Sequence, residues 1–242
     1  MIMPPQENIE KFNQAYEMFR KTGAIKNGPG HFVYSSRDHG VIYIDKKEIF
    51  NNSTQTSILC EQIAEHFKCL EIDAVAGPES GGIIMANWVA MHSSRLCERK
   101  VDVIHLFKKG PLMVVGKDQE KKISGKKILL VDDIATTGSS LKKCAEIINN
   151  LEGLIVGIGL LWLRGNESIF LNLFQGIPVF PLIRARLDGW SEEQCRLIGP
   201  CSKNLPINTE FGHGAEFLKE HPEFKAVTDV PFIVGKKTPI NN

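Results

Sequence analysis

The chain has 242 residues, of which 43% are hydrophobic, and its formal net charge at pH 7 is +1. This composition favours a folded protein with a substantial core, and the balanced charge gives no basic surface for nucleic acid or an anionic membrane. The longest apolar run, residues 154–163, is about half of what a membrane-spanning helix needs, so it is predicted to be a buried strand. The first residues lack the pattern of a secretion signal and the six cysteines are scattered, so we expect a reduced, cytoplasmic protein.

The first 50 residues are predicted to form a helix followed by a hairpin. The helix is indicated by apolar residues that share one face, namely Ile9, Phe12, Tyr16 and Phe19. Gly23 can end this helix, and residues 31–36 and 41–45 have the composition of two short strands across a polar turn. We therefore treat residues 1–50 as an N-terminal segment of their own.

Residues 51–185 are predicted to alternate between helices and strands. After a helix over residues 58–67, the predicted strands are residues 73–76, 101–107, 128–131, 154–164 and 177–183. Such alternation implies right-handed crossovers and a mainly parallel sheet, so the fold class is α/β. Residues 110–125 are polar and are predicted to be a solvated loop. Residues 186–242, where Gly, Pro and Asn interrupt the pattern, are predicted to be a C-terminal extension.

Two acids and a turn of small residues follow one of the predicted strands. Asp132 and Asp133 come directly after the apolar run 128–131, and ligands of parallel sheets bind outside the carboxyl ends of the strands. Residues 136–140 are Thr, Thr, Gly, Ser and Ser, and a helix begins near Leu141. A small-residue turn at a helix N-terminus offers N–H groups, hydroxyl groups and the positive end of the helix dipole to a phosphate.

The two carboxylates can in addition accept hydrogen bonds from vicinal hydroxyl groups, so these features together predict a sugar-phosphate site. The alternative is an acidic strand end followed by an ordinary helix cap. No GxxxxGK followed by Ser or Thr occurs in the chain, and no GxGxxG occurs either. The sequence therefore argues against a P-loop triphosphatase and against a standard dinucleotide site.

The segment 128–140, "ILLVDDIATTGSS", resembles the phosphoribosyl-pyrophosphate (PRPP) motif of the type I phosphoribosyltransferases. The likeness extends over roughly residues 8–185 and is greatest to the orotate phosphoribosyltransferase branch. The segments that carry it are "GHFVYSSRDHGVIYID", "AVAGPESGGI", "HLFKKG" and "LLWLRGNES". The resemblance implies the type I phosphoribosyltransferase fold, a mainly parallel sheet flanked by helices, with residues 1–50 as a hood, 51–185 as the core and 186–242 as an extension.

The resemblance also implies a role for each matching residue. Asp132 and Asp133 would hold the ribose hydroxyls and, with Lys109, make up the catalytic set. The residues implied to cradle the 5′-phosphate are Ala135, Thr136, Thr137, Gly138, Ser139 and Ser140. Those implied to meet the pyrophosphate are Gly77, Pro78, Glu79, Ser80, Gly81 and Gly82, together with Lys108. Arg164 would face the base, and the family's non-proline cis peptide would fall between Glu79 and Ser80.

The implied reaction transfers the 5-phosphoribosyl group from PRPP to a nucleobase, with an orotate-like pyrimidine favoured, and releases pyrophosphate carrying Mg²⁺. The resemblance implies a homodimer acting on small molecules, and the balanced charge favours neither a nucleic-acid nor a membrane partner. Leu112 and Val114 stand near the places of a lysine and a histidine in the family's mobile loop, where Lys117, Lys121 and Lys122 are possible substitutes. A purine phosphoribosyltransferase and a non-catalytic PRPP-binding regulator therefore remain as alternatives.

One group of possible metal ligands lies outside the resemblance. Cys195, Cys201 and His213 are residue types that bind zinc, and a fourth ligand would be His221 or an acid. The five-residue gap between the cysteines is wider than usual zinc-finger spacing, so ordinary packing of the extension is the alternative. His213, between two glycines, is alternatively a cap over the active site.

Overall fold

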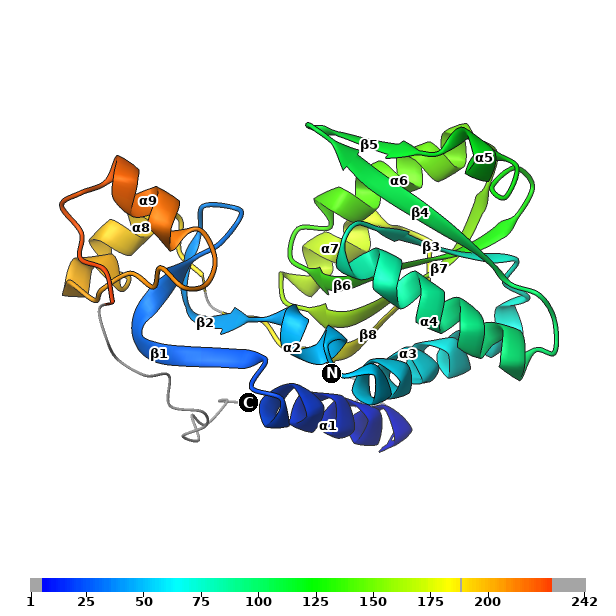
Figure 1. Ribbon diagram of the computed structural model, residues 1–242, viewed down its shortest axis with the longest axis horizontal. Helices are drawn as coiled ribbons and strands as arrows, with labels where there is room; N and C mark the ends of the chain where they lie inside the picture. The colour runs from blue at the N-terminus through cyan, green and yellow to red at the C-terminus, as the bar shows by residue number, and fades with distance from the viewer. Residues whose placement is uncertain (1–5, 188, 228–242) are drawn as a thin grey trace. The chain divides into compact units, whose positions relative to one another are not determined.

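The computed structural model describes residues 6–187 and 189–227. The described residues divide into two compact units, which we call the sheet unit (residues 6–18 and 49–186) and the hairpin unit (residues 19–48, 187 and 189–227). The predicted N-terminal hairpin and the predicted C-terminal extension are thus parts of one unit. This grouping differs from the three consecutive segments expected from the sequence (Figure 1).

The sheet unit is built on one six-stranded sheet with the order β5-β4-β3-β6-β7-β8. Its strands are β3 (Ala74–Pro78), β4 (Asp102–Lys109), β5 (Leu112–Val115), β6 (Lys127–Ala135), β7 (Leu154–Leu163) and β8 (Val179–Arg184). All neighbouring strands pair in parallel except β4 and β5. The predicted α/β class and the mainly parallel sheet are therefore confirmed.

Helices cover both faces of this sheet. They are α3 (Ser53–Phe67), α4 (Gly81–Leu96), α6 (Ser139–Asn150) and α7 (Glu167–Leu173), with the short helices η1 (Lys68–Leu70) and α5 (Lys117–Glu120). Helices α1 (Gln6–Lys21) and α2 (Lys46–Phe50) lead from one unit to the other along the chain. In Figure 1, α3 and α4 lie on one face of the sheet and α6 and α7 on the other. As predicted, α1 ends just before Gly23, which has a φ of 73°.

Successive side chains of each strand point alternately toward these two helical layers, because a β-strand repeats every two residues. One set packs with α6 and α7 in the main apolar cluster, which includes Ile128, Leu130, Ile158, Leu160, Leu141, Cys144 and Phe170. On the other face, a Cβ atom at Gly157 of β7 would lie 2.6 Å from the Phe67 ring of α3. Gly157 therefore lets a helix approach the sheet closely enough to bury a large aromatic side chain.

The predicted loop over residues 110–125 is wrong in its first part. Gly110, with a φ of 59°, turns the chain so that β5 pairs antiparallel with β4, from Lys109 opposite Leu112 to Leu106 opposite Val115. The reason is the apolar run 112–115, whose Met113 is buried in the main cluster. The charges of residues 117–122 dominated the sequence pattern and hid this short edge strand.

The hairpin unit contains the antiparallel strands β1 (Ile25–Val33) and β2 (His39–Ile44), followed after a long interval of sequence by α8 (Glu192–Leu197), η2 (Cys201–Lys203) and α9 (Gly214–Glu220). Isolated bridges pair His31 with Ile207 and His39 with Trp190. Among its described residues, one apolar cluster that joins the two segments is formed by Val33, Ile207 and Phe217 with partly buried Leu218 and Phe224. Neither unit, over its described residues, has a helix with the length and apolar character needed to cross a membrane.

Candidate active site

The two acids lie inside β6, which continues to Ala135. Asp133 is buried, with 4% of its surface exposed, and Asp132 is half-buried. The N–H of Ile134 donates to Asp133 Oδ1 at 2.6 Å, and the N–H of Asp133 donates to Asp132 Oδ1 at 2.9 Å. Because adjacent strand residues point to opposite faces, the two carboxylates leave opposite sides of the sheet and are held by the backbone.

Each acid lies on the side of a different helical layer. Asp132 lies on the side of α6, where burial raises the pKa of the Cys144 thiol to about 12 and the charge of Asp132 adds to this effect. Asp133 lies on the side of α4, beside Gly81. The carboxyl end of β6 therefore presents negative charge to both neighbouring turns.

The turn after β6 has the features of a phosphate site. Gly138 begins α6 with a φ of 75°, a conformation that favours glycine, and a Cβ atom there would lie 2.9 Å from the Phe170 ring. Thr137 Oγ1 donates to Ser139 Oγ at 3.2 Å, and both residues are exposed. The exposed hydroxyl groups thus lie at the N-terminus of a twelve-residue helix, where an anion is favoured.

The second glycine-rich turn, residues 77–82, links β3 to α4. It contains the cis peptide between Glu79 and Ser80 that was predicted. A Cβ atom at Gly81 would overlap Asp133 Oδ2, so this turn lies directly against the buried acid of β6. The turn is anchored to β4 as well, because Glu79 N donates to Leu106 O and Glu79 Oε1 accepts from Lys108 N, both at 2.8 Å.

Lys108 and Lys109 end β4 and are exposed beside this turn. The three lysines considered as substitutes for a mobile-loop lysine lie elsewhere. α5, which begins with Lys117, is held beside the body of β4, since His105 N donates to Gln119 Oε1 at 2.7 Å. The pKa of His105 is lowered by burial and further by the charge of Lys122. Among the lysines considered, only the two at the end of β4 lie at the carboxyl edge of the sheet.

Arg164 follows β7 at the same edge. Its N–H donates to Ala135 O at 2.9 Å, and the neighbouring Gly165 packs against the carbonyl of Thr136 so closely that a Cβ atom would overlap it. The predicted base-binding residue therefore emerges next to the predicted phosphate turn. All the site residues implied by the resemblance lie in the sheet unit, at the carboxyl ends of β3, β4, β6 and β7 or in the turns and helix starts that follow them.

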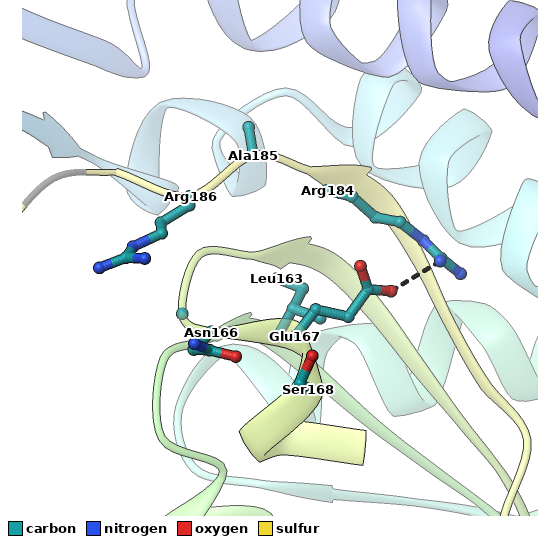
Figure 2. Close-up of a pocket in the computed structure, with 8 residues that line it drawn as sticks. Leu163, Asn166, Glu167, Ser168, Arg184, Ala185 and Arg186 are labelled. Carbon is teal, nitrogen blue, oxygen red and sulfur yellow. Dashed lines mark hydrogen bonds and ion pairs between the residues drawn. The ribbon is translucent and has the colours of Figure 1, made fainter. Parts of the chain in front are cut away.

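A pocket of about 260 Å³ opens beside these turns, at the carboxyl ends of β7 and β8 (Figure 2). Its lining residues are Leu163, Gly165, Asn166, Glu167, Ser168, Arg184, Ala185 and Arg186. Figure 2 shows Glu167 reaching toward Arg184, whose Nη1 donates to Glu167 Oε1 at 2.7 Å. The sequence did not predict this pocket, although most of its lining residues lie in the segment 160–168 that carries part of the resemblance.

The fold and this edge define a class: α/β proteins whose anion-binding turns lie at the carboxyl edge of a parallel sheet. The model of the phosphoribosyl transferase domain matches residues 47–171 of this chain. The chain belongs to this family and is a phosphoribosyltransferase, which confirms the family and the enzyme class predicted from the sequence.

The chain is also similar to individual members of this family. It is 31% identical over 192 residues to an orotate phosphoribosyltransferase of Caldanaerobacter subterraneus subsp. tengcongensis, covering 79% of this chain and 92% of that one. It is 30% identical over 196 residues to that of Thermoanaerobacter sp. strain X514, covering 80% and 94%. A phosphoribosyltransferase structure from Corynebacterium diphtheriae matches with a TM-score of 0.57 at 19% identity, over 72% of this chain and 96% of that one, and shows the shared fold.

Proposed function

We propose that this enzyme transfers the phosphoribosyl group of PRPP to orotate and releases pyrophosphate. The observation that carries the proposal is the contact of two anion-binding turns with one acidic strand end. Residues 77–82 lie directly against Asp133, and residues 136–140 follow the same strand. PRPP has this arrangement of groups, since its ribose hydroxyls lie between a pyrophosphate and a 5′-phosphate.

In this reaction the bond from C1′ to the pyrophosphate oxygen breaks, and a bond forms from C1′ to a nitrogen of the base. The sugar is cationic in between, so no nucleophilic side chain is required. Asp132 and Asp133 would orient the ribose and offset its positive charge, while Lys108 and Lys109 would stabilise the leaving pyrophosphate. Positioning and electrostatic stabilisation are the protein's contributions to such a step.

Mg²⁺ fits the residues of this edge. Two carboxylates beside a turn suited to pyrophosphate are a donor set that Mg²⁺ shares with substrate phosphates, and the half-buried Asp132 has room for a hydrated ion. Asp132, the less buried of the two acids, is the residue that would hold it together with the substrate, and the ion would neutralise charge on the pyrophosphate.

Orotate is favoured over a purine for two reasons. The most similar relatives described above are named orotate phosphoribosyltransferases. Arg164 adds a guanidinium group next to the phosphate turn, and a guanidinium can pair with the carboxylate that distinguishes orotate from other nucleobases. A PRPP-binding regulator is less favoured because membership of the enzyme family extends across the whole candidate site.

The direct test is pyrophosphate release from PRPP and Mg²⁺ in the presence of orotate, uracil, adenine, guanine or hypoxanthine. We expect release with orotate alone. Arg164→Gln should raise the KM for orotate by about tenfold or more and change the KM for PRPP little, since a lost charge-assisted pair is worth ~1.5–3 kcal/mol. Arg95→Gln, which removes an exposed charge on α4, is the control. Release with a purine, or PRPP binding without release by any base, would overturn the proposal.

We also propose that the enzyme is a homodimer. The β4–β5 hairpin exposes apolar side chains, with Phe107 40% and Leu112 64% exposed, and such a surface is commonly covered by another chain. Light scattering at micromolar concentration should give the mass of a dimer, and Leu112→Lys should shift it toward the monomer. Leu197→Lys, at an equally exposed position of the hairpin unit, should not. A monomeric parent chain would contradict this proposal.

A further inference from the structure

Four potential metal ligands converge inside the hairpin unit. His31 and His39 come from β1 and β2, Cys195 from α8, and Cys201 from the start of η2. One ligand atom of each lies within 4.8 Å of those of the other three. His31, His39 and Cys195 are fully buried, and Cys201 is 4% exposed.

The distances among these atoms are close to those of a tetrahedral site. His31 Nε2 and His39 Nδ1 are 3.1 Å apart, and Cys201 Sγ lies 3.3 Å from the first and 3.4 Å from the second. Ligands at about 2.0–2.3 Å from a tetrahedral zinc ion lie roughly 3.3–3.8 Å from one another. The two histidines and Cys201 are therefore spaced as three ligands of one ion would be, and Cys195 Sγ, within 4.8 Å of each of them, is close enough to complete the site.

The surroundings orient the ligands toward that centre. His31 Nδ1 lies 3.1 Å from Pro206 O, so with its proton there Nε2 presents its lone pair to the group. A backbone carbonyl that fixes the ring of a histidine in this way is a recurrent feature of metal sites. The N–H of Cys201 donates to Cys195 Sγ at 3.2 Å, which fixes the position of that sulfur beside the other ligand atoms.

Hydrogen bonding alone leaves this group poorly explained. If His31 Nδ1 donates to Pro206, the short contact with His39 requires His39 Nδ1 to carry its proton, and His39 Nε2 is then an acceptor. Two imidazoles and two thiols are thus removed from water with few partners other than one another, which is costly. A bound cation would use all four ligand atoms at once.

We propose that His31, His39, Cys195 and Cys201 bind one zinc ion in a closed, structural site. Two nitrogen and two sulfur ligands are a donor set typical of zinc, and burial leaves no open position for substrate. This corrects the ligand set considered from the sequence: His213 is exposed and contacts Glu216, whereas His31 and His39 complete the group. Because the new ligands lie more than 150 residues before the cysteines, spacing alone could not reveal them.

The site explains how the hairpin is joined to the C-terminal extension. Each histidine lies at a bridge between the two segments, since His31 N donates to Pro206 O at 2.9 Å and His39 N to Trp190 O at 2.7 Å. The described apolar cluster that joins these segments has only three buried residues, and small domains commonly gain stability from a metal ion. The ion would hold together segments that are distant in sequence.

The test is the metal content of the full chain purified under reducing conditions without added metal. We expect elemental mass spectrometry to find about one zinc ion per chain. When zinc is added back to protein that a chelator has stripped of metal, protons should be released. Replacement by Co²⁺ should give the intense visible bands of tetrahedral coordination and the charge-transfer absorption of cobalt–thiolate bonds. These signals report the ligands independently of enzymatic activity.

Variants identify the ligands. Cys201→Ser and His39→Asn should each lose most of the bound zinc and lower the melting temperature, and a chelator should lower the melting temperature of the parent but not of these variants. The matched controls are His213→Asn in the same unit and Cys69→Ser, an exposed thiol of the sheet unit, both of which should keep full zinc content. To separate loss of binding from loss of folding, Cys201→His, which keeps four ligands, should retain a tetrahedral Co²⁺ spectrum with weaker thiolate absorption.

Other outcomes would overturn the proposal. A metal-free parent chain that also fails to take up Co²⁺ contradicts it, as does a disulfide between Cys195 and Cys201 under reducing conditions. Loss of zinc from His213→Asn but not from His39→Asn would restore the ligand set considered from the sequence instead.

Discussion

The sheet unit and the hairpin unit are stabilised in different ways. The sheet unit buries near-continuous apolar strands between two helical layers, and its polar site lies at the edge of that core. The hairpin unit joins two distant segments around a small apolar cluster, with imidazole and thiol groups fully buried beside it. The comparison shows that a unit with a large apolar core can place its functional groups at the edge of that core. A small unit depends for its stability on the specific interactions of a few residues.

Equal truncations in the two units should give the largest effects and test this contrast. Phe170 of α7 and Phe217 of α9 are each 1% exposed, and replacing either by Ala should lower the free energy of unfolding by ~3–5 kcal/mol. Phe217 also packs edge-on against the ring of His39, with centroids 4.8 Å apart. We therefore expect Phe217→Ala, but not Phe170→Ala, to weaken zinc retention.

Denaturant titrations can follow the two units separately. Trp162 is buried in β7 and Trp190 pairs with His39 in the hairpin unit, so variants in which Trp162 or Trp190 is the single tryptophan left, with Trp88 replaced in both, would report on one unit each. Phe211→Ala, a half-buried ring of the hairpin unit, is the control and should cost less. If Phe170→Ala releases zinc as readily as Phe217→Ala, the two units do not differ in the way described.

A change at the edge of the core should affect binding more than folding. Gly81→Ala places a methyl group where Asp133 Oδ2 lies, so the carboxylate must move. We expect at least a tenfold loss of PRPP affinity, or ~1.4 kcal/mol, by calorimetric titration. Gly116→Ala is the matched control, because its Cβ atom would meet only the movable carboxylate of Asp118. Unchanged PRPP binding by a folded Gly81→Ala protein would separate this turn from the substrate site.

Asp133→Asn changes the charge of the same residue without adding an atom. If the carboxylate accepts hydrogen bonds from the ribose, PRPP affinity should fall by ~1 kcal/mol or more, while the melting temperature changes little. Asp118→Asn, an acid of α5, should bind PRPP as the parent does. An unaltered affinity in the folded Asp133→Asn protein would remove Asp133 from the proposed site.

The contrast between the units also explains what the sequence could predict. Periodic apolar runs specify the strands and helices of the sheet unit, and the acids and glycines after β6 and β3 occur in continuous motifs. Those local signals predicted the fold and the candidate edge. The pairing of β5 and the zinc ligands depend on contacts between distant residues, such as His31 with Pro206, which leave no pattern in a single sequence.

The smallest expected effect is electrostatic and lies at the other end of the sheet. Asp73 precedes β3, and its Oδ2 accepts a hydrogen bond from the N–H of Lys127 at 2.9 Å, while Oδ1 pairs with Arg99 at 3.3 Å. The pKa of Asp73 is lowered chiefly by the hydrogen bond from Lys127 and also by nearby cationic groups, against the opposing effect of burial.

Because this pKa is lower in the folded state than the ordinary ~3.9 of the unfolded chain, the charged form stabilises the fold above that value. The stabilisation is fully present at neutral pH and is lost as the pH falls through the lowered folded pKa. Asp73→Asn should therefore reduce the free energy of unfolding by ~1 kcal/mol at pH 7, and the difference from the parent should vanish in acid.

Urea titrations between neutral pH and pH 3 would measure this difference. Glu71→Gln is the control: Glu71 is exposed, pairs with Lys127, and should show a smaller effect that salt screens. PRPP affinity should stay the same in both variants, since Asp73 and Glu71 lie at the amino ends of the strands, away from the candidate site. A difference for Asp73→Asn that persists in acid would mean that packing, and not the charge, is what Asp73 contributes.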